Sequence, residues 1–273
     1  MYIGATAFNT HYPPHNSSGI YGYEPLVLEY LEKAVGKDKV DEAMAVVLMN
    51  DPYFGGICAM FDSEKENDWG SGTSISYFPV AGRGDDLITL IQHETGGHGF
   101  AKLADEYVHP LNINNYIDAE DKLYHQAKAK SGWYKNVDFT DDPGTIKWSR
   151  ILSDPRYDGE DMGIYEGGAT YGYGVWRPSE SSLMNDNRNG FNAVSREAIY
   201  YRIHKLAYGD SWVYDYEEFV KYDEINRKAS AAQSSESKTA VKARTHAAAP
   251  IIMKKTWKEV IEEGRNGTYV MGR

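Results

Sequence analysis

The 273-residue chain has a formal net charge of −11, from 29 Lys and Arg against 40 Asp and Glu. This acidic balance argues against a nucleic-acid-binding protein, which needs basic side chains to displace counterions from phosphates, and against adhesion to an anionic membrane surface. Charged residues at 25% and hydrophobic residues at 41% are typical of a globular protein, and the single cysteine, Cys58, excludes an intrachain disulfide.

Three segments in the first third of the chain predict regular structure. Residues 24–34 place apolar side chains at helical spacing and stop before Gly36, which predicts a helix. The continuous apolar run 43–49 predicts a buried strand. Residues 73–78 are β-prone and partly alternating, and Pro79 marks them as an edge strand because proline cannot donate to a sheet. A substrate peptide can add to such an edge through backbone hydrogen bonds.

The middle of the chain is less regular. Residues 108–175 are rich in Tyr, Gly and Asp, and we expect long cleft-shaping loops there with one helix over 118–130. Within this stretch, residues 165–174 are predicted to form a flexible aromatic loop. That loop either lines a substrate pocket or is an ordinary glycine loop.

The C-terminal part differs in composition and predicts a division into three parts. Residues 228–249, rich in Ala, Ser and Lys, predict a flexible linker between a main domain at 1–227 and a tail at 250–273. In the tail we expect a strand at 251–253 and a helix at 256–264. The N-terminus lacks the basic start and apolar run of a signal peptide, and no segment approaches the ~20 apolar residues of a membrane helix.

The residues with the clearest chemistry are 93–98, HETGGH, which follow an apolar run at 87–91 that predicts a buried helix. Two imidazoles and a carboxylate are the ligand types of zinc sites that keep one coordination position open. A Glu directly after the first His is placed to act as general base on zinc-bound water. The segment therefore predicts a hydrolytic zinc site with Glu94 as its base.

The spacing of the two histidines is unusual. His93 and His98 are five residues apart, which is about 140° on a regular α-helix and too far round to share an ion. A single π-type turn would return both side chains to one face, and Gly96 and Gly97 supply the backbone freedom for it. The alternative is a pair of unrelated helix histidines, with Gly-Gly ending the helix.

Residues 99–107, GFAKLADEY, resemble the stretch after the zinc helix in the IgA-peptidase family of secreted bacterial metallopeptidases. That family reads His-Glu-x-Gly-His, a short apolar and glycine-rich stretch, and Leu-x-Asp-Glu-Tyr; this chain has one extra residue between the histidines. Residues 176–185 resemble the family's methionine turn, with Met184 as its methionine. Residues 45–56 are similar to its core strand and Tyr-Gly-Gly turn, and residues 191–199 to its C-terminal helix.

The resemblance implies a fold and a cofactor. The fold is an α+β, metzincin-like zinc-peptidase domain at 1–227, in which a twisted mixed β-sheet and an active-site helix precede a smaller irregular C-terminal subdomain with a methionine turn. The implied cofactor is Zn²⁺, held by His93, His98 and a third ligand. The usual position for that ligand, six residues after the second His, is Ala104, which cannot bind a metal.

The family's Asp-Glu pair implies Asp105 as the third ligand. Glu106 is the rival, and His109 is a more distant alternative. Whichever carboxylate does not bind the metal is expected to orient a ligand from behind.

Two functions from different classes are consistent with these residues. The first is a zinc metalloendopeptidase, a hydrolase of peptide bonds in protein or peptide substrates such as extracellular glycoproteins, which the resemblance places outside the cytoplasm. The alternative is a catalytically inactive module that binds a metal, a peptide or a glycoprotein in the same cleft. The five-residue spacing favours the module, whereas the carboxylate of Glu94 favours the enzyme.

Overall fold

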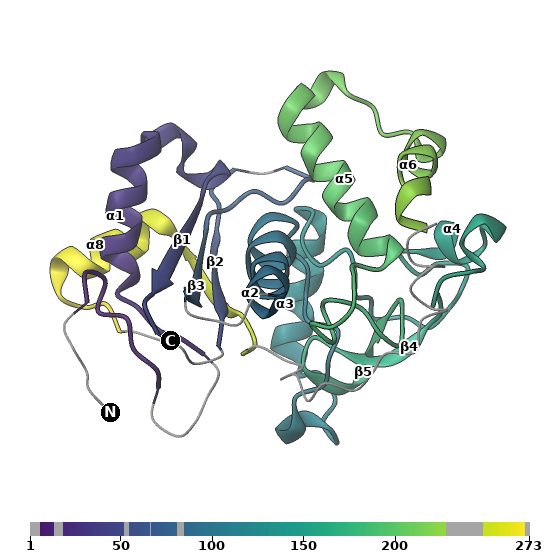
Figure 1. The fold of residues 1–273 in the computed structure, drawn as a ribbon, viewed down its shortest axis with the longest axis horizontal. Helices are drawn as coiled ribbons and strands as arrows, with labels where there is room; N and C mark the ends of the chain where they lie inside the picture. Colours follow the sequence, from purple (N-terminus) through teal and green to yellow (C-terminus); the bar gives the residue numbers. More distant parts are fainter. Residues whose placement is uncertain are drawn as a thin grey trace. The chain divides into compact units, whose positions relative to one another are not determined.

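The structure is a computed structural model that describes residues 6–13, 19–51, 55–65, 67–80, 85–227 and 248–270 (Figure 1). The chain forms two compact units. Unit 1 comprises Met1–Asn67, Ser71–Phe100 and His246–Arg273, and unit 2 comprises Asp68–Gly70 and Ala101–Thr245. The mixture of helices with a mixed sheet agrees with the predicted α+β class. The linker predicted at 228–249 lies almost wholly outside the described residues, so the domain boundaries stay predictions.

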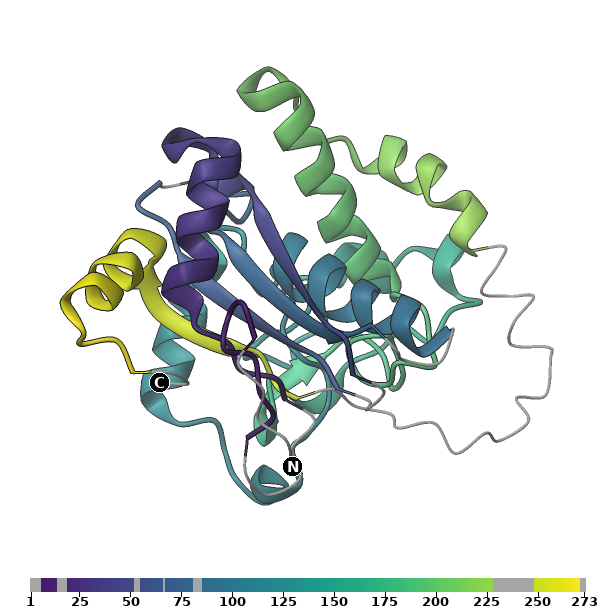
Figure 2. The ribbon, with the colours of Figure 1, turned by 60° about the vertical axis from the view of Figure 1, so that its left-hand side comes forward.

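Unit 1 is built on a four-stranded mixed sheet with the order β1-β3-β2-β6. β1 (Met44–Met49) runs parallel to β3 (Ser74–Pro79), and β2 (Ile57–Asp62) runs antiparallel to β3. β6 (Ile251–Thr256), drawn in yellow in Figure 2, runs parallel to β2. The strand predicted at 251–253 is therefore confirmed, and it completes a sheet that begins two hundred residues earlier in the sequence.

Two predictions about strand position are wrong. β3 lies between β1 and β2 rather than at an edge, and all six of its residues are buried. Pro79 is tolerated there because it is the last residue of the strand, where the ladder ends. The strand predicted at 43–49, β1, is instead one of the two edge strands, so it is only partly buried: Val46 and Leu48 are 47% and 56% exposed.

Two helices of unit 1 share an apolar core with the sheet. α1 (Glu24–Val35) confirms the first predicted helix and ends at Gly36, whose φ of 84° suits glycine. α8 (Trp257–Asn266) confirms the predicted tail helix, and Thr256 and Glu259 form a capping box at its start. The core they share includes Leu28, Ile75, Tyr77 and Val260.

Glu24, the first residue of α1, is a fully buried carboxylate. Burial raises the pKa of Glu24 above its ordinary 4.5, although the Tyr269 hydroxyl donates a 2.5 Å hydrogen bond to it and His11 favours its charged form. Tyr77 also interacts with the Glu24 charge. The folded protein therefore holds a proton on Glu24 up to a higher pH than the unfolded chain does, so this group's contribution to stability is full below the unfolded pKa and is lost as the pH rises through the folded pKa.

Replacing this carboxyl with an amide is expected to remove that decline. Between the unfolded and folded pKa values of Glu24, this group lowers the wild-type free energy of unfolding by up to about 1.4 kcal/mol per pH unit. Urea denaturation of Glu24→Gln at several pH values should show that this component is lost. Glu32→Gln, two turns further along α1, is the control and should keep the wild-type slope. An unchanged slope in Glu24→Gln would contradict the assignment.

Unit 2 contains four helices and a hairpin for which bounds can be given: α3 (Ala119–Lys130), α4 (Ser149–Leu152), α5 (Ala193–Tyr208), α6 (Tyr216–Tyr222), β4 (Tyr165–Gly168) and β5 (Tyr171–Arg177). α3 confirms the helix predicted over 118–130, and the Asp118 side chain caps it. Short 3₁₀ helices span Lys37–Glu42 in unit 1 and Pro110–Asn112, Pro155–Tyr157 and Gly209–Ser211 in unit 2. The core of unit 2 includes Trp148, Tyr157, Tyr200 and Phe219.

The flexible loop predicted at 165–174 is instead a β-hairpin. β4 and β5 pair antiparallel, and the residues that join them, Ala169 and Thr170, have φ values of 47° and 71°. Positive φ at both central positions is the geometry of a tight hairpin turn. Across the described ranges, no helix is both long enough and apolar enough to cross a bilayer.

Candidate metal centre

The two histidines lie on a π-helix. α2 (Asp85–Leu90) leads into the π-helix η2, which spans Ile91–Phe100. Because a π-helix bonds residue i to residue i+5, His93 and His98 lie one turn apart on the same face. The predicted π-type geometry is confirmed, and it extends over ten residues rather than a single turn. The alternative, in which Gly96-Gly97 ends the helix, is wrong.

The geometry of the two imidazoles suits a shared ion. Their Nε2 atoms are 3.1 Å apart, and the ring planes are 76° from each other. Two nitrogens bound to one tetrahedral zinc at about 2.0–2.1 Å lie about 3.3 Å apart. Both side chains are buried, at 1% and 0% exposure, so they are held in place by packing.

Asp105 joins the histidines. The candidate ligand atoms of His93, His98 and Asp105 all lie within 4.8 Å of one another, and all three residues are buried. Among the residues that the structure describes, this is the one group of three such side chains that could hold a metal ion. Two imidazoles and a carboxylate are a donor set that zinc accepts, so the three predicted ligands fit the predicted ion.

The two rival ligands are used elsewhere. The Glu106 carboxylate accepts hydrogen bonds from Ser182 Oγ at 2.6 Å, from Asn136 Nδ2 at 2.9 Å and from Asn192 Nδ2 at 3.0 Å. Burial raises the pKa of Glu106, and these hydrogen bonds partly offset that effect. His109 caps a 3₁₀ helix, where its Nδ1 accepts from the Leu111 amide. Neither residue belongs to the group around the histidines.

Glu94, the predicted base, directly follows His93 in η2 and is fully buried. Its side chain approaches the backbone of Gly56, where an added Cβ would lie 3.4 Å from Glu94 Cγ and 3.2 Å from Leu90 Cδ2. Gly56, the residue before β2, therefore packs closely against this side of the helix. Glu94 is held in a fixed position one residue from the first histidine.

The predicted methionine turn is a turn in the structure. The Asn185 amide donates to the Ser182 carbonyl at 3.0 Å, and Met184 lies inside this turn, fully buried. The Met184 carbonyl accepts a 2.8 Å hydrogen bond from the Glu106 amide. The residue after Asp105 is thus bonded directly to the turn.

Asn136, Ser182 and Asn192 were missed as site residues by sequence reasoning. They lie 30, 76 and 86 residues after Glu106, so no spacing pattern relates them to it. Asn192 does carry one local signal, because an Asn near the start of the helix predicted at 191–199 is a typical N-cap, and its Oδ1 caps α5 by accepting from the Ser195 amide at 2.9 Å. That signal predicts a cap and says nothing of Glu106.

Gly99 allows η2 to pack closely on the sheet. A Cβ there would lie 2.8 Å from Ser74 Oγ and 3.2 Å from the Glu94 carbonyl oxygen. Gly99→Ala is therefore expected to lower the free energy of unfolding by about 1–3 kcal/mol, the usual range for overpacking, and to weaken metal binding. Chemical denaturation and metal titration measure the two effects.

The partner of this clash offers a rescue. Ser74 Oγ is buried and makes no hydrogen bond to the described part of the chain, so Ser74→Ala alone should be nearly neutral. In the double variant Gly99→Ala/Ser74→Ala, much of the lost stability should return. Equal stability of Gly99→Ala and the double variant would mean that the Glu94 carbonyl, and not Ser74, limits the space for a side chain at position 99.

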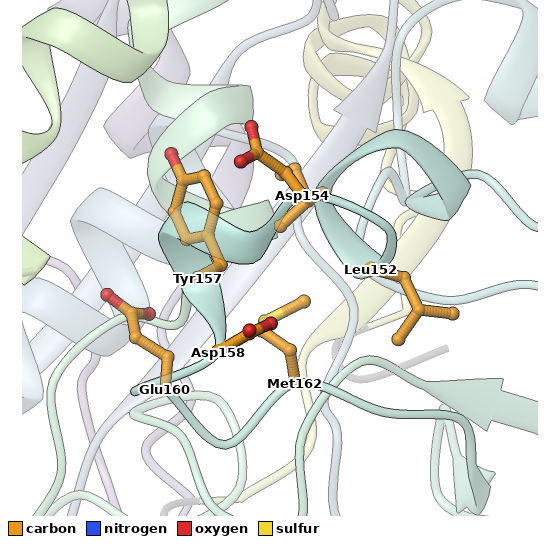
Figure 3. A pocket seen from close by; sticks show the side chains of 7 residues that line it. Leu152, Asp154, Tyr157, Asp158, Glu160 and Met162 are labelled. Carbon is orange, nitrogen blue, oxygen red and sulfur yellow. The ribbon is translucent and has the colours of Figure 1, made fainter.

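A separate hollow lies in unit 2 (Figure 3). It has a volume of about 220 Å³ and is lined by Ile151, Leu152, Asp154, Tyr157, Asp158, Glu160 and Met162. Two of its carboxylates already have cationic partners: Arg156 contacts Asp154 at 2.6 Å, and Arg196 contacts Glu160 at 2.7 Å. The Arg156 contact holds the pKa of Asp154 well below its usual range. None of the predicted site residues lines this hollow.

Comparison of the sequence with models of known protein families and with curated proteins finds no match to either.

Proposed function

We propose that this protein is a zinc-dependent endopeptidase with a metzincin-like fold, related to the IgA-peptidase type. One observation carries the proposal: the π-helix brings His93 and His98 to one face, and Asp105 supplies a carboxylate within 4.8 Å of both. Glu94, one residue from His93, supplies a carboxylate that can act as a general base beside these three ligands. A purely structural metal site would normally use a fourth protein ligand.

Each residue has a distinct task in this proposal. His93, His98 and Asp105 hold the ion, and their burial keeps their donor atoms oriented. A bound Zn²⁺ supplies Lewis acidity and lowers the pKa of a water molecule towards ~7. Glu94 accepts the proton from the attacking water and delivers it to the leaving amine. The chain therefore provides one group for proton transfer and three for metal binding.

The substrate class follows from the same resemblance. We propose protein or peptide substrates, including extracellular glycoproteins, and a location outside the cytoplasm. The alternative of an inactive binding module rested on the five-residue spacing of the histidines. Since the π-helix reconciles that spacing with a shared ion, the described geometry gives no particular support to the module.

The test is metal content combined with peptide hydrolysis. The purified protein should hold one zinc ion per chain and cleave internal bonds in a mixture of unfolded proteins, with the cut sites read by mass spectrometry. A chelator should abolish cleavage, and added zinc should restore it. Absence of zinc binding would refute the metal site, whereas stoichiometric zinc without cleavage of any peptide would favour the binding module.

A further inference from the structure

We propose that Glu106 is a positioning residue, which fixes the third metal ligand, Asp105, by bonding it to the methionine turn and to the start of α5. This inference rests on the proposed metal site. The hydrogen bonds that carry it all lie within unit 2, and they hold each residue from Ala104 to Glu106.

Asn136 fixes the residue before Asp105. Its Oδ1 accepts from the Ala104 amide at 2.9 Å, and its Nδ2 donates to the Ala104 carbonyl at 2.8 Å. This two-point contact copies the pairing of a neighbouring strand. The same Nδ2 also donates to Glu106 at 2.9 Å, and Asn136 is fully buried. The Asn136 side-chain amide therefore holds the backbone of Ala104, before Asp105, and the side chain of Glu106, after Asp105.

Backbone bonds hold Asp105 and Glu106 themselves. The Asp105 carbonyl accepts a 2.8 Å hydrogen bond from the Ala169 amide, at the turn of the β4–β5 hairpin. The Glu106 amide donates to the Met184 carbonyl, also at 2.8 Å. With its peptide groups bonded on both sides, the Asp105 side chain starts from a backbone with little freedom. Such preorganisation is what a metal ligand needs, because a loosely held ligand weakens the site.

The Glu106 carboxylate connects this segment to two others. Ser182, from the methionine turn, and Asn192, which caps α5, both donate to it. Only a carboxylate can accept all of these bonds. A glutamine would have nearly the same shape, but its NH₂ group would face a donor, so at least one buried bond would become a donor–donor contact.

The experiment compares metal affinity in Glu106→Gln with that in Glu197→Gln. Glu197 is a suitable control because it is a largely buried carboxylate on α5 with its own donor, Tyr214. Zinc affinity is measured by competition with a chelator. We expect Glu106→Gln to bind zinc about 10–100-fold more weakly, as is typical when a residue behind a metal ligand is lost. Glu197→Gln should bind zinc as tightly as the wild type.

A second readout separates positioning from general destabilisation. The visible absorption of bound Co²⁺ reports the arrangement of its ligands, so Glu106→Gln should change the spectrum and Glu197→Gln should not. If Glu106→Gln fails to fold, Ser182→Ala removes one hydrogen bond from the same carboxylate and should shift affinity in the same direction by a smaller factor.

The outcomes distinguish this inference from the proposed function. Wild-type protein that binds neither zinc nor cobalt would overturn both. Wild-type protein that binds zinc, with equal affinity and an equal cobalt spectrum in the Glu106 and Ser182 variants, would overturn the positioning role and leave the metal site intact. Weaker binding in Glu106→Gln and Glu197→Gln alike would also overturn it, because the effect would then be one of general stability.

Discussion

Glu94→Gln is expected to lower the rate of peptide hydrolysis by about 10²–10⁴-fold, the usual contribution of a general base, while the zinc content stays at the wild-type value. The amide has nearly the same size as the carboxylate, so it fits the same space beside Gly56. It cannot accept the proton of the attacking water. The measurement is kcat/KM on one cleaved peptide, with zinc content determined on the same preparation.

A neighbouring substitution provides the control for this loss. Gln92→Asn changes an exposed side chain on the same π-helix, two residues before Glu94, and should leave both hydrolysis and zinc content unchanged. Retained hydrolysis in Glu94→Gln would refute the role of Glu94 as the base. Loss of zinc together with hydrolysis would show that Glu94 supports the metal ligands instead of transferring a proton.

Zinc is expected to stabilise the folded protein, and His98→Ala should abolish that stabilisation. At a free zinc concentration about 1,000 times the dissociation constant, the free energy of unfolding should rise by about 4 kcal/mol. Without His98, the remaining His93 and Asp105 offer only two ligands, so the gain should vanish. Denaturation in urea with and without zinc measures the difference for each variant.

His109→Ala is the matched control, because His109 was an alternative to Asp105 and Glu106 as the third metal ligand. It lies outside the metal group, so the variant should keep the full stabilisation by zinc. A gain that survives in His98→Ala would place the ion elsewhere. If the stabilisation by zinc disappeared in His109→Ala, His109 would be the third ligand in place of Asp105.

The structure brings together the two histidines and the aspartate that the sequence predicts as metal ligands, and the bound ion itself stays a prediction. The conflict between the five-residue spacing and a shared ion could be resolved only by a π-type turn, and Gly96-Gly97 made that turn feasible. Asp105 followed from family resemblance, since the usual ligand position is occupied by Ala104. Both inferences involve residues within thirteen positions of each other, where spacing along the chain determines proximity in space.

The failures concern contacts between distant segments. Pro79 signals a strand end, and it was read as a sheet edge because the sequence does not show which strand pairs on the other side of β3. The partners of Glu106 are ordinary Asn and Ser residues far along the chain, and only the tertiary fold selects them. The hairpin at 165–177 has many glycines, which weaken the alternation that identifies strands.

The place of β6 in the sheet determines when unit 1 can fold during synthesis. The chain is synthesised from its N-terminus, so β1, β2, β3 and the π-helix η2 are all made long before β6 and α8. Until then, β2 has an open hydrogen-bonding edge, and the core of unit 1 lacks Met253, Trp257, Val260 and Ile261. Unit 1 can therefore finish folding only after β6 and α8 have been synthesised, long after the residues of its first three strands.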